Sequence, residues 1–205
     1  MSSDSSVFPG TTRIEAFSDA VIAIIITIMV LDLKLPKESL GAGFWGGLVV
    51  PILPRLIPYL LSFSVIAIIW VRHHLLLHMA VRATGAILWS NIHLLLWMSV
   101  IPVTTAALGE NPLLPLAVAI YGFVLAGNAL AFFVLRWSVY RDTRDTDMRL
   151  VHIDLLRRDA FVAALYVLSM PLAFVSVYLS AAIFVLMPAL FFLPDLRTRS
   201  RGTAK

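Results

Sequence analysis

The chain has 205 residues, of which 60% are hydrophobic and only 14% charged, and its formal net charge is +4 at pH 7. Soluble domains are about 45–50% apolar and about 25% charged, so this composition indicates a polytopic membrane protein, of the all-α class because its apolar runs are long. Cysteine is absent, which excludes disulfides, thiol catalysis and cysteine metal sites. The arginines stand beside apolar segments, so we expect a lipid bilayer as partner and no nucleic acid.

The first apolar segment, residues 13–35, begins with polar side chains and is then apolar from Ala20 to Leu31 except for Thr27. A helix over most of this segment spans about 28 Å, close to a hydrocarbon core of about 30 Å. Polar groups near one end of such a helix are costly to bury without partners. We therefore expect more than a plain membrane anchor here.

Five further apolar segments predict five more membrane helices, at about residues 48–79, 84–108, 113–137, 160–177 and 180–194. Three prolines should bend the start of the second helix, after a loop over residues 36–47. Residues 136–159 hold six arginines and five aspartates, and their apolar spacing favours a helix lying at the membrane interface. The chain would form one six-helix domain over residues 1–205.

The positions of lysine and arginine decide between five and six spans. With six spans, thirteen of these residues lie on the inner side, and only Lys34, Lys37 and Arg55 lie outside. This distribution follows the positive-inside rule and places both termini in the cytoplasm, with the protein in the cytoplasmic membrane. Five spans would put the arginine-rich tail outside.

Polar side chains gather at the inner ends of the first three predicted helices. Because they share one depth in the membrane, we expect them to meet. The expected members are Arg13, Phe17, Ser18, Asp19, Trp70, His73, His74 and Asn91. A hydrogen-bonded clamp that holds three helices together is the favoured interpretation. Gating or proton sensing by His73 or His74 is the alternative, since histidine titrates near neutral pH.

A metal site is a third interpretation of the same region. His74 and His78 are four residues apart, which places them on one helical face, and Asp19 could add a carboxylate. Membrane metallohydrolases use such ligands, but this spacing without a glutamate base is a weak signal. We therefore expect no catalytic residue, metal or cofactor.

The first helix also carries one stripe at positions i, i+3, i+4 and i+7, formed by Ile24, Thr27, Ile28 and Leu31. All but Thr27 are apolar, so the residues alone favour ordinary packing or lipid contact for this stripe.

Three motifs resemble the transmembrane protein 175 family of potassium channels, in its six-helix prokaryotic form. Arg13-x-x-x-Phe17-Ser18-Asp19 opens the first membrane helix, a W-x-x-H-H motif ends the second at His74, and Asn91 and Pro102 lie in the third. The resemblance covers these three helices and implies that the first lines a central pore. The stripe residues would then form the constriction, with the Thr27 hydroxyl contributing to selectivity.

The resemblance further implies a passive potassium-selective channel, with potassium as the permeant ion. The sequence contains no TVGYG segment, so selectivity would not come from a filter of that kind. The Arg13 motif occurs once in this chain, so a central pore needs several copies and we expect a homotetramer. A proton or other cation pathway through Asp19 and the histidines is the alternative. A metallohydrolase, a secondary transporter and a purely structural membrane protein are less favoured.

Overall fold

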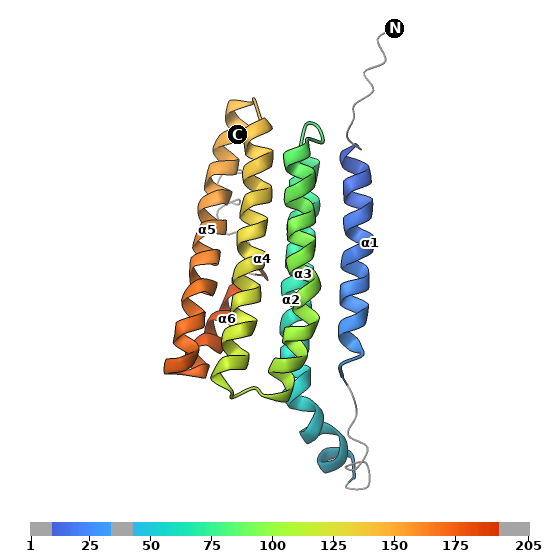
Figure 1. Ribbon diagram of the computed structural model, residues 1–205, viewed down its shortest axis with the longest axis vertical. Helices are drawn as coiled ribbons and strands as arrows, with labels where there is room; N and C mark the ends of the chain where they lie inside the picture. Colours follow the sequence, from blue (N-terminus) through green and yellow to red (C-terminus); the bar gives the residue numbers. More distant parts are fainter. Residues whose placement is uncertain (1–9, 34–42, 193–205) are drawn as a thin grey trace, which may run out of the picture.

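The structure is a computed structural model that describes residues 10–33 and 43–192, and its regular elements are all helical. Each long helix runs antiparallel to the one before it, which gives an up-and-down bundle (Figure 1). The α-helices are α1 (Thr11–Val30), α2 (Val50–His78), α3 (Gly85–Glu110), α4 (Pro115–Asp142), α5 (Thr146–Val175) and α6 (Val177–Phe192). The predicted all-α class is therefore confirmed in the described residues, which contain six α-helices.

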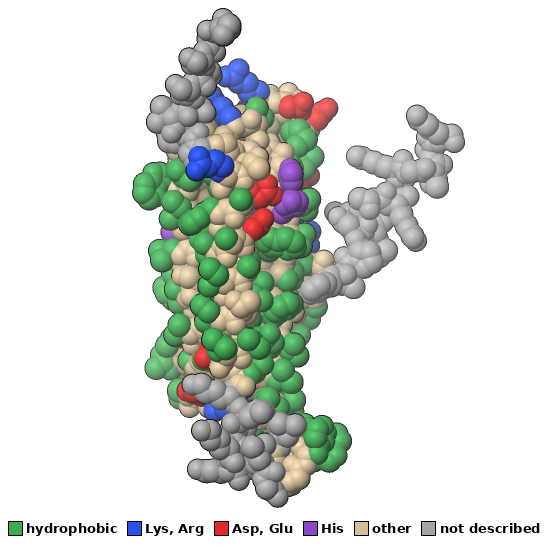
Figure 2. All heavy atoms as spheres, turned by 90° about the vertical axis from the view of Figure 1, so that its right-hand side faces the viewer, with side chains coloured by type: hydrophobic (Ala, Val, Ile, Leu, Met, Phe, Trp, Pro, Cys, Tyr) green, Lys and Arg blue, Asp and Glu red, His purple; other side chains and the backbone are tan. Residues whose placement is uncertain are grey.

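Four of these helices, α2 to α5, are long and apolar enough to cross a membrane. The apolar helix α6 is shorter, and α1 carries Arg13, Glu15 and Asp19 within its 20 residues. Figure 2 shows an apolar surface along the bundle, with charged side chains gathered towards its two ends. This distribution fits a protein embedded in a bilayer.

A short π-helix, η2 (Phe44–Val49), precedes α2 and shortens the predicted loop, of which residues 36–42 lie outside the described part of the chain. Gly43 begins it with a φ of 80°, a conformation that L side chains rarely adopt. Pro51 lies in the first turn of α2, and Pro54 and Pro58 lie inside the helix. Figure 1 shows η2 and the first turn of α2 at an angle to the rest of α2, as the prolines predict.

The charged segment over residues 136–159 does not form the separate interfacial helix that the sequence predicts. Its first part completes α4, and its second part belongs to α5, a continuous helix of 30 residues. The helix can carry charge into the bundle because Asp159 is paired there with two arginines. The break between the last two helices lies at Ser176, slightly before the predicted position.

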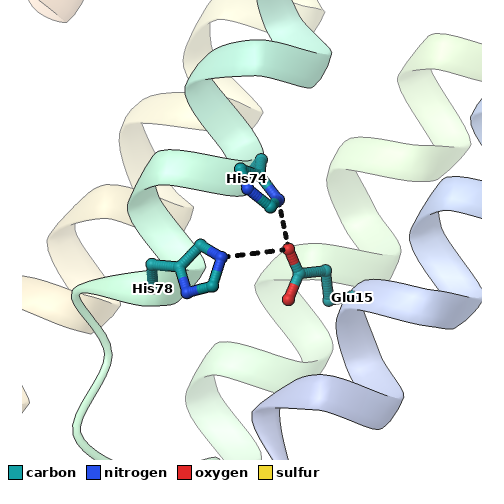
Figure 3. A group of neighbouring side chains, drawn as sticks. All are labelled: Glu15, His74 and His78. Carbon is teal, nitrogen blue, oxygen red and sulfur yellow. Dashed lines mark ion pairs between the residues drawn. The ribbon is translucent and has the colours of Figure 1, made fainter.

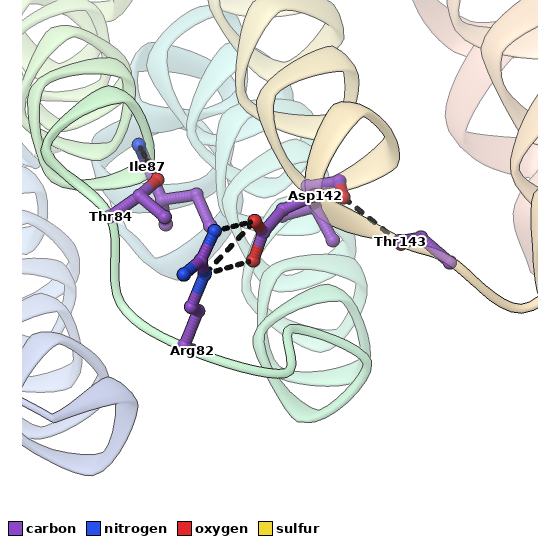
Figure 4. Close-up of polar contacts among 6 residues, drawn as sticks. Arg82, Thr84, Ile87, Asp142 and Thr143 are labelled. Carbon is purple, nitrogen blue, oxygen red and sulfur yellow. Dashed lines mark hydrogen bonds and ion pairs between the residues drawn. The ribbon is translucent and has the colours of Figure 1, made fainter.

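Side chains define the connections at the end of the bundle where α3 and α5 begin. Thr84 accepts a hydrogen bond from the Ile87 amide at 3.3 Å, and Asp145 caps α5 in the same way. Arg82, in the α2–α3 connection, donates hydrogen bonds of 2.8–3.1 Å to Asp142 at the end of α4 (Figure 4). These bonds and the carboxylate charge raise the pKa of Arg82.

The core is centred on α4, which packs against α3 and α5 over most of its length. By contrast, α1 packs only against α2 and α3 among the described elements. Its packed face consists of Ile14, Ser18, Ile22, Ile25 and Met29. The opposite face of α1 is therefore left uncovered by the rest of the described chain.

Candidate functional site

A chain of hydrogen bonds joins the first three helices at the level of Ser18. His73 Nε2 donates to Asn91 Oδ1 at 2.6 Å, and Asn91 Nδ2 donates to Ser18 Oγ at 2.9 Å. Ser18 Oγ in turn donates to the Ile14 carbonyl at 2.8 Å. The side chains of His73, Asn91 and Ser18 are fully buried. The predicted meeting of these three residues is observed, and its geometry is that of a clamp.

The direction of these bonds fixes the tautomer of His73. Because Asn91 Oδ1 can only accept, the proton of a neutral His73 ring must lie on Nε2. The other nitrogen, Nδ1, is buried and has no hydrogen-bond partner among the described residues. A second proton there would find no acceptor, which favours a structural role for His73 over proton sensing.

A second contact between α1 and α2 lies beside this chain. Trp70 Nε1 donates a hydrogen bond to Asp19 Oδ1 at 2.8 Å. The Trp70 ring also stacks on His74, with 6.3 Å between the ring centroids. The Asp19 carboxylate is therefore hydrogen-bonded to Trp70, and it forms no ion pair with His74 or His78 in the described part of the chain.

The carboxylate that does face the histidines belongs to Glu15, one turn before Asp19 (Figure 3). Glu15 Oε1 contacts His74 Nδ1 and lies 3.7 Å from His78 Nε2. The suggestion that Asp19 could supply a carboxylate beside these histidines is therefore wrong. Glu15 and Asp19 are separated by one helical turn on the same side of α1, so the sequence could not distinguish them.

Two members of the predicted cluster lie outside it. The Arg13 side chain is exposed and forms no ion pair or hydrogen bond with the part of the chain that the structure describes. Phe17 is also exposed. Both lie on the uncovered side of α1, so any partners they have must come from outside this subunit or outside the described residues.

The predicted stripe on α1 coincides with the uncovered face. Ile24, Ile28 and Leu31 are 56%, 48% and 69% exposed, whereas Ile22 and Ile25 on the packed face are 2% and 5% exposed. Leu31 lies directly after the last residue of α1. The exposed Thr27 Oγ1 donates to the carbonyls of Ala23 and Ile24 at 3.0 and 2.9 Å. These side chains are therefore not packed against the described part of the subunit.

A buried ionic triad was not predicted. Asp159 of α5 pairs with Arg72 of α2 and accepts a hydrogen bond from Arg136 Nε of α4 at 2.6 Å. Asp159 and Arg136 are 2% and 3% exposed, and the guanidinium of Arg72 lies over the Phe132 ring at 4.4 Å. The triad ties α2, α4 and α5 together. The positive-inside count places Arg72 and Arg136 on the inner side, and Asp159 belongs to the segment predicted to lie at the membrane interface. Neither prediction indicates that the three residues pair.

A polar contact in the other half of the bundle was also missed. Ser62 Oγ lies 2.7 Å from Thr105 Oγ1 and 2.9 Å from the Tyr121 hydroxyl, and all three residues are buried. Each hydroxyl thus has a partner in an apolar interior, and α2, α3 and α4 are joined there. Isolated hydroxyl residues within apolar runs carry no sequence signal that they face one another.

Comparisons with known proteins agree with the helix arrangement. Residues 13–102, which extend from α1 into α3, match the family described as endosomal/lysosomal potassium channel TMEM175. A potassium channel of Chryseobacterium sp. is 36% identical over 185 residues, which cover 90% of this chain and 94% of the relative. A potassium channel of Streptomyces collinus is 36% identical over 178 residues, covering 83% and 85% of the two chains.

A solved structure has the same fold. The crystal structure of a lysosomal potassium-selective channel TMEM175 homolog from Chamaesiphon minutus superposes with a TM-score of 0.78 at 30% identity. The superposition covers 88% of this chain and 95% of that one. The likeness therefore extends over nearly the whole bundle.

Proposed function

The chain belongs to the TMEM175 family of potassium channels, and from this we propose that it passes potassium passively across the cytoplasmic membrane. It is a membrane protein and not an enzyme, because its family is one of ion channels. The metallohydrolase interpretation is therefore wrong. Potassium is the permeant ion in this proposal, and no cofactor takes part.

The observation that carries the proposal is the uncovered face of α1. In a single subunit it leaves Ile24, Ile28 and Leu31 exposed together with the Thr27 hydroxyl. One helical face cannot enclose a pore, but four copies around an axis can. We propose a homotetramer in which α1 of each subunit faces the axis, with both termini in the cytoplasm.

In this arrangement the aliphatic side chains form the narrowest part of the path. A ring of isoleucine or leucine side chains can stop hydrated ions by bulk and by dewetting. The Thr27 Oγ1 proton is directed to its own helix, which leaves oxygen lone pairs free to replace part of an ion's water shell. Thr27 would therefore favour potassium, in place of a TVGYG filter.

The proton or other cation pathway through Asp19 and the histidines has less support. The hydrogen-bond chain from His73 ends at the Ile14 carbonyl, and Asp19 is bonded to Trp70 instead. A proton entering this chain would have no further acceptor in it. The polar cluster is better suited to hold α1 in place.

The proposal is tested by ion flux through purified protein in liposomes. A potassium gradient should drive rapid flux, and the same gradient of sodium should drive much less. Equal flux for both ions would contradict potassium selectivity, and no flux above protein-free liposomes would contradict channel function. A parallel run with a pH gradient separates potassium conduction from a proton pathway.

A further inference from the structure

The group formed by Glu15, His74 and His78 is the starting point. Its ligand atoms, one from each side chain, all lie within 4.8 Å of one another. An ion held tetrahedrally at about 2.0–2.1 Å needs ligand atoms about 3.3 Å apart, so small side-chain rotations suffice. Figure 3 shows both imidazole rings of α2 directed at the same carboxylate oxygen of α1.

The Glu15 carboxylate faces both imidazole rings, but neither contact has the geometry of a hydrogen bond. Glu15 Oε1 is buried, yet it accepts no hydrogen bond among the described residues although two ring nitrogens face it. A buried carboxylate oxygen normally has a polar partner, and a cation placed between the three side chains would contact this oxygen and both ring nitrogens at once. Two imidazole nitrogens and one carboxylate oxygen form a set that Zn²⁺ prefers, whereas Ca²⁺ prefers oxygen ligands alone.

The surroundings fix the ligands and leave the site accessible. The His74 ring is held by its stacking on Trp70, which is in turn bonded to Asp19. Such outer contacts orient metal ligands. The His78 side chain is 62% exposed, so an ion can enter from the aqueous end of the bundle, and water can complete the coordination.

We propose that Glu15, His74 and His78 form a Zn²⁺ site that joins α1 to α2 at the inner end of the bundle. This departs from the expectation of no metal drawn from the sequence. Because α1 packs only against α2 and α3 among the described elements, the ion would add a contact beside the Trp70–Asp19 bond and hold the start of α1 against α2. The regulatory consequence, a zinc-dependent change in potassium flux, rests on the proposed channel function.

Zinc binding is measured directly on the full chain, purified in detergent, freed of any polyhistidine tag and dialysed against chelator. Titration calorimetry with zinc chloride should show one ion per subunit, and the thermal unfolding midpoint should rise with zinc. Calcium chloride should give neither effect. Glu15→Gln and His78→Ala should each weaken zinc binding by about tenfold or more.

His93→Ala is the matched control, since it removes one exposed histidine from α3, away from the group. It should bind zinc like the wild type. The proposal is overturned if the wild type takes up no zinc, if His78→Ala binds it unchanged, or if His93→Ala loses it too. These measurements need no ion flux, so they stand or fall separately from channel function.

Discussion

The side-chain amide of Asn91 donates a hydrogen bond of 2.9 Å to Ser18 Oγ, and this bond joins α3 to α1 in a fully buried position. The same amide group accepts from His73 of α2 through its oxygen. Asn91 of α3 is thus hydrogen-bonded to both α1 and α2. It holds the packed face of α1 and so determines which face remains open.

Ser18→Ala should destabilise the protein by about 1–3 kcal/mol, because it leaves the Asn91 amide buried without an acceptor. Ser99→Ala makes the same change at an exposed position of α3, where the hydroxyl bonds to its own helix at Leu96. Thermal unfolding monitored by size exclusion should show a lower midpoint for Ser18→Ala only. Equal midpoints for the two variants would mean that the clamp adds little stability.

Asp159→Asn should cost about 3–5 kcal/mol, because it leaves the buried Arg136 without its counter-charge. Asp154→Asn is the control on the same helix, since its partner Arg157 is 3.5 Å away and both side chains are about 80% exposed. That exposed pair is worth about 0–1 kcal/mol. We expect a lower yield and a lower unfolding midpoint for Asp159→Asn than for Asp154→Asn. A stable Asp159→Asn protein would show that the triad is dispensable.

Gly127→Ala tests the packing of α4 on α3. A Cβ at this position would lie 2.3–2.5 Å from ring atoms of Trp97, which the rigid indole cannot avoid without moving. We expect a loss of about 1–3 kcal/mol in stability from this overpacking. Gly10→Ala, where a Cβ meets nothing within 4 Å, should behave like the wild type. An unchanged unfolding midpoint for Gly127→Ala would argue against the close helix contact.

Much of this fold could be predicted from the sequence, because long apolar runs separated by polar connections determine the helices and their order. The cluster of Ser18, His73 and Asn91 was also predictable, since three polar residues at one depth of a membrane seek partners. The contact of Glu15, and not Asp19, with the histidines could not be predicted, because it depends on the axial position of α1 relative to α2. The pairing of Arg72 with Asp159 joins residues far apart in the chain, and only the packed bundle brings them together.

Thr27→Val should reduce the preference for potassium over sodium without widening the pore, because it keeps the shape of the side chain and removes the hydroxyl. Ile24→Ala should instead raise conductance and lower selectivity, since it shortens the constriction and its dewetting barrier. Single-channel recordings in bilayers with potassium and sodium on opposite sides measure both quantities. If both variants changed conductance in the same way, the separate roles of hydroxyl and aliphatic side chains would be refuted.

The most direct test of the central claim is chemical modification of cysteines placed along α1, in a protein without native cysteine. Single cysteines at Ile24, Thr27, Ile28 and Leu31 are compared with cysteines at Ile22 and Ile25 on the packed face. Potassium current is recorded before and after a charged, water-soluble thiol reagent. We predict that current changes for the four positions of the open face and not for the two packed positions. Unchanged current through all four open-face variants would contradict a pore lined by α1.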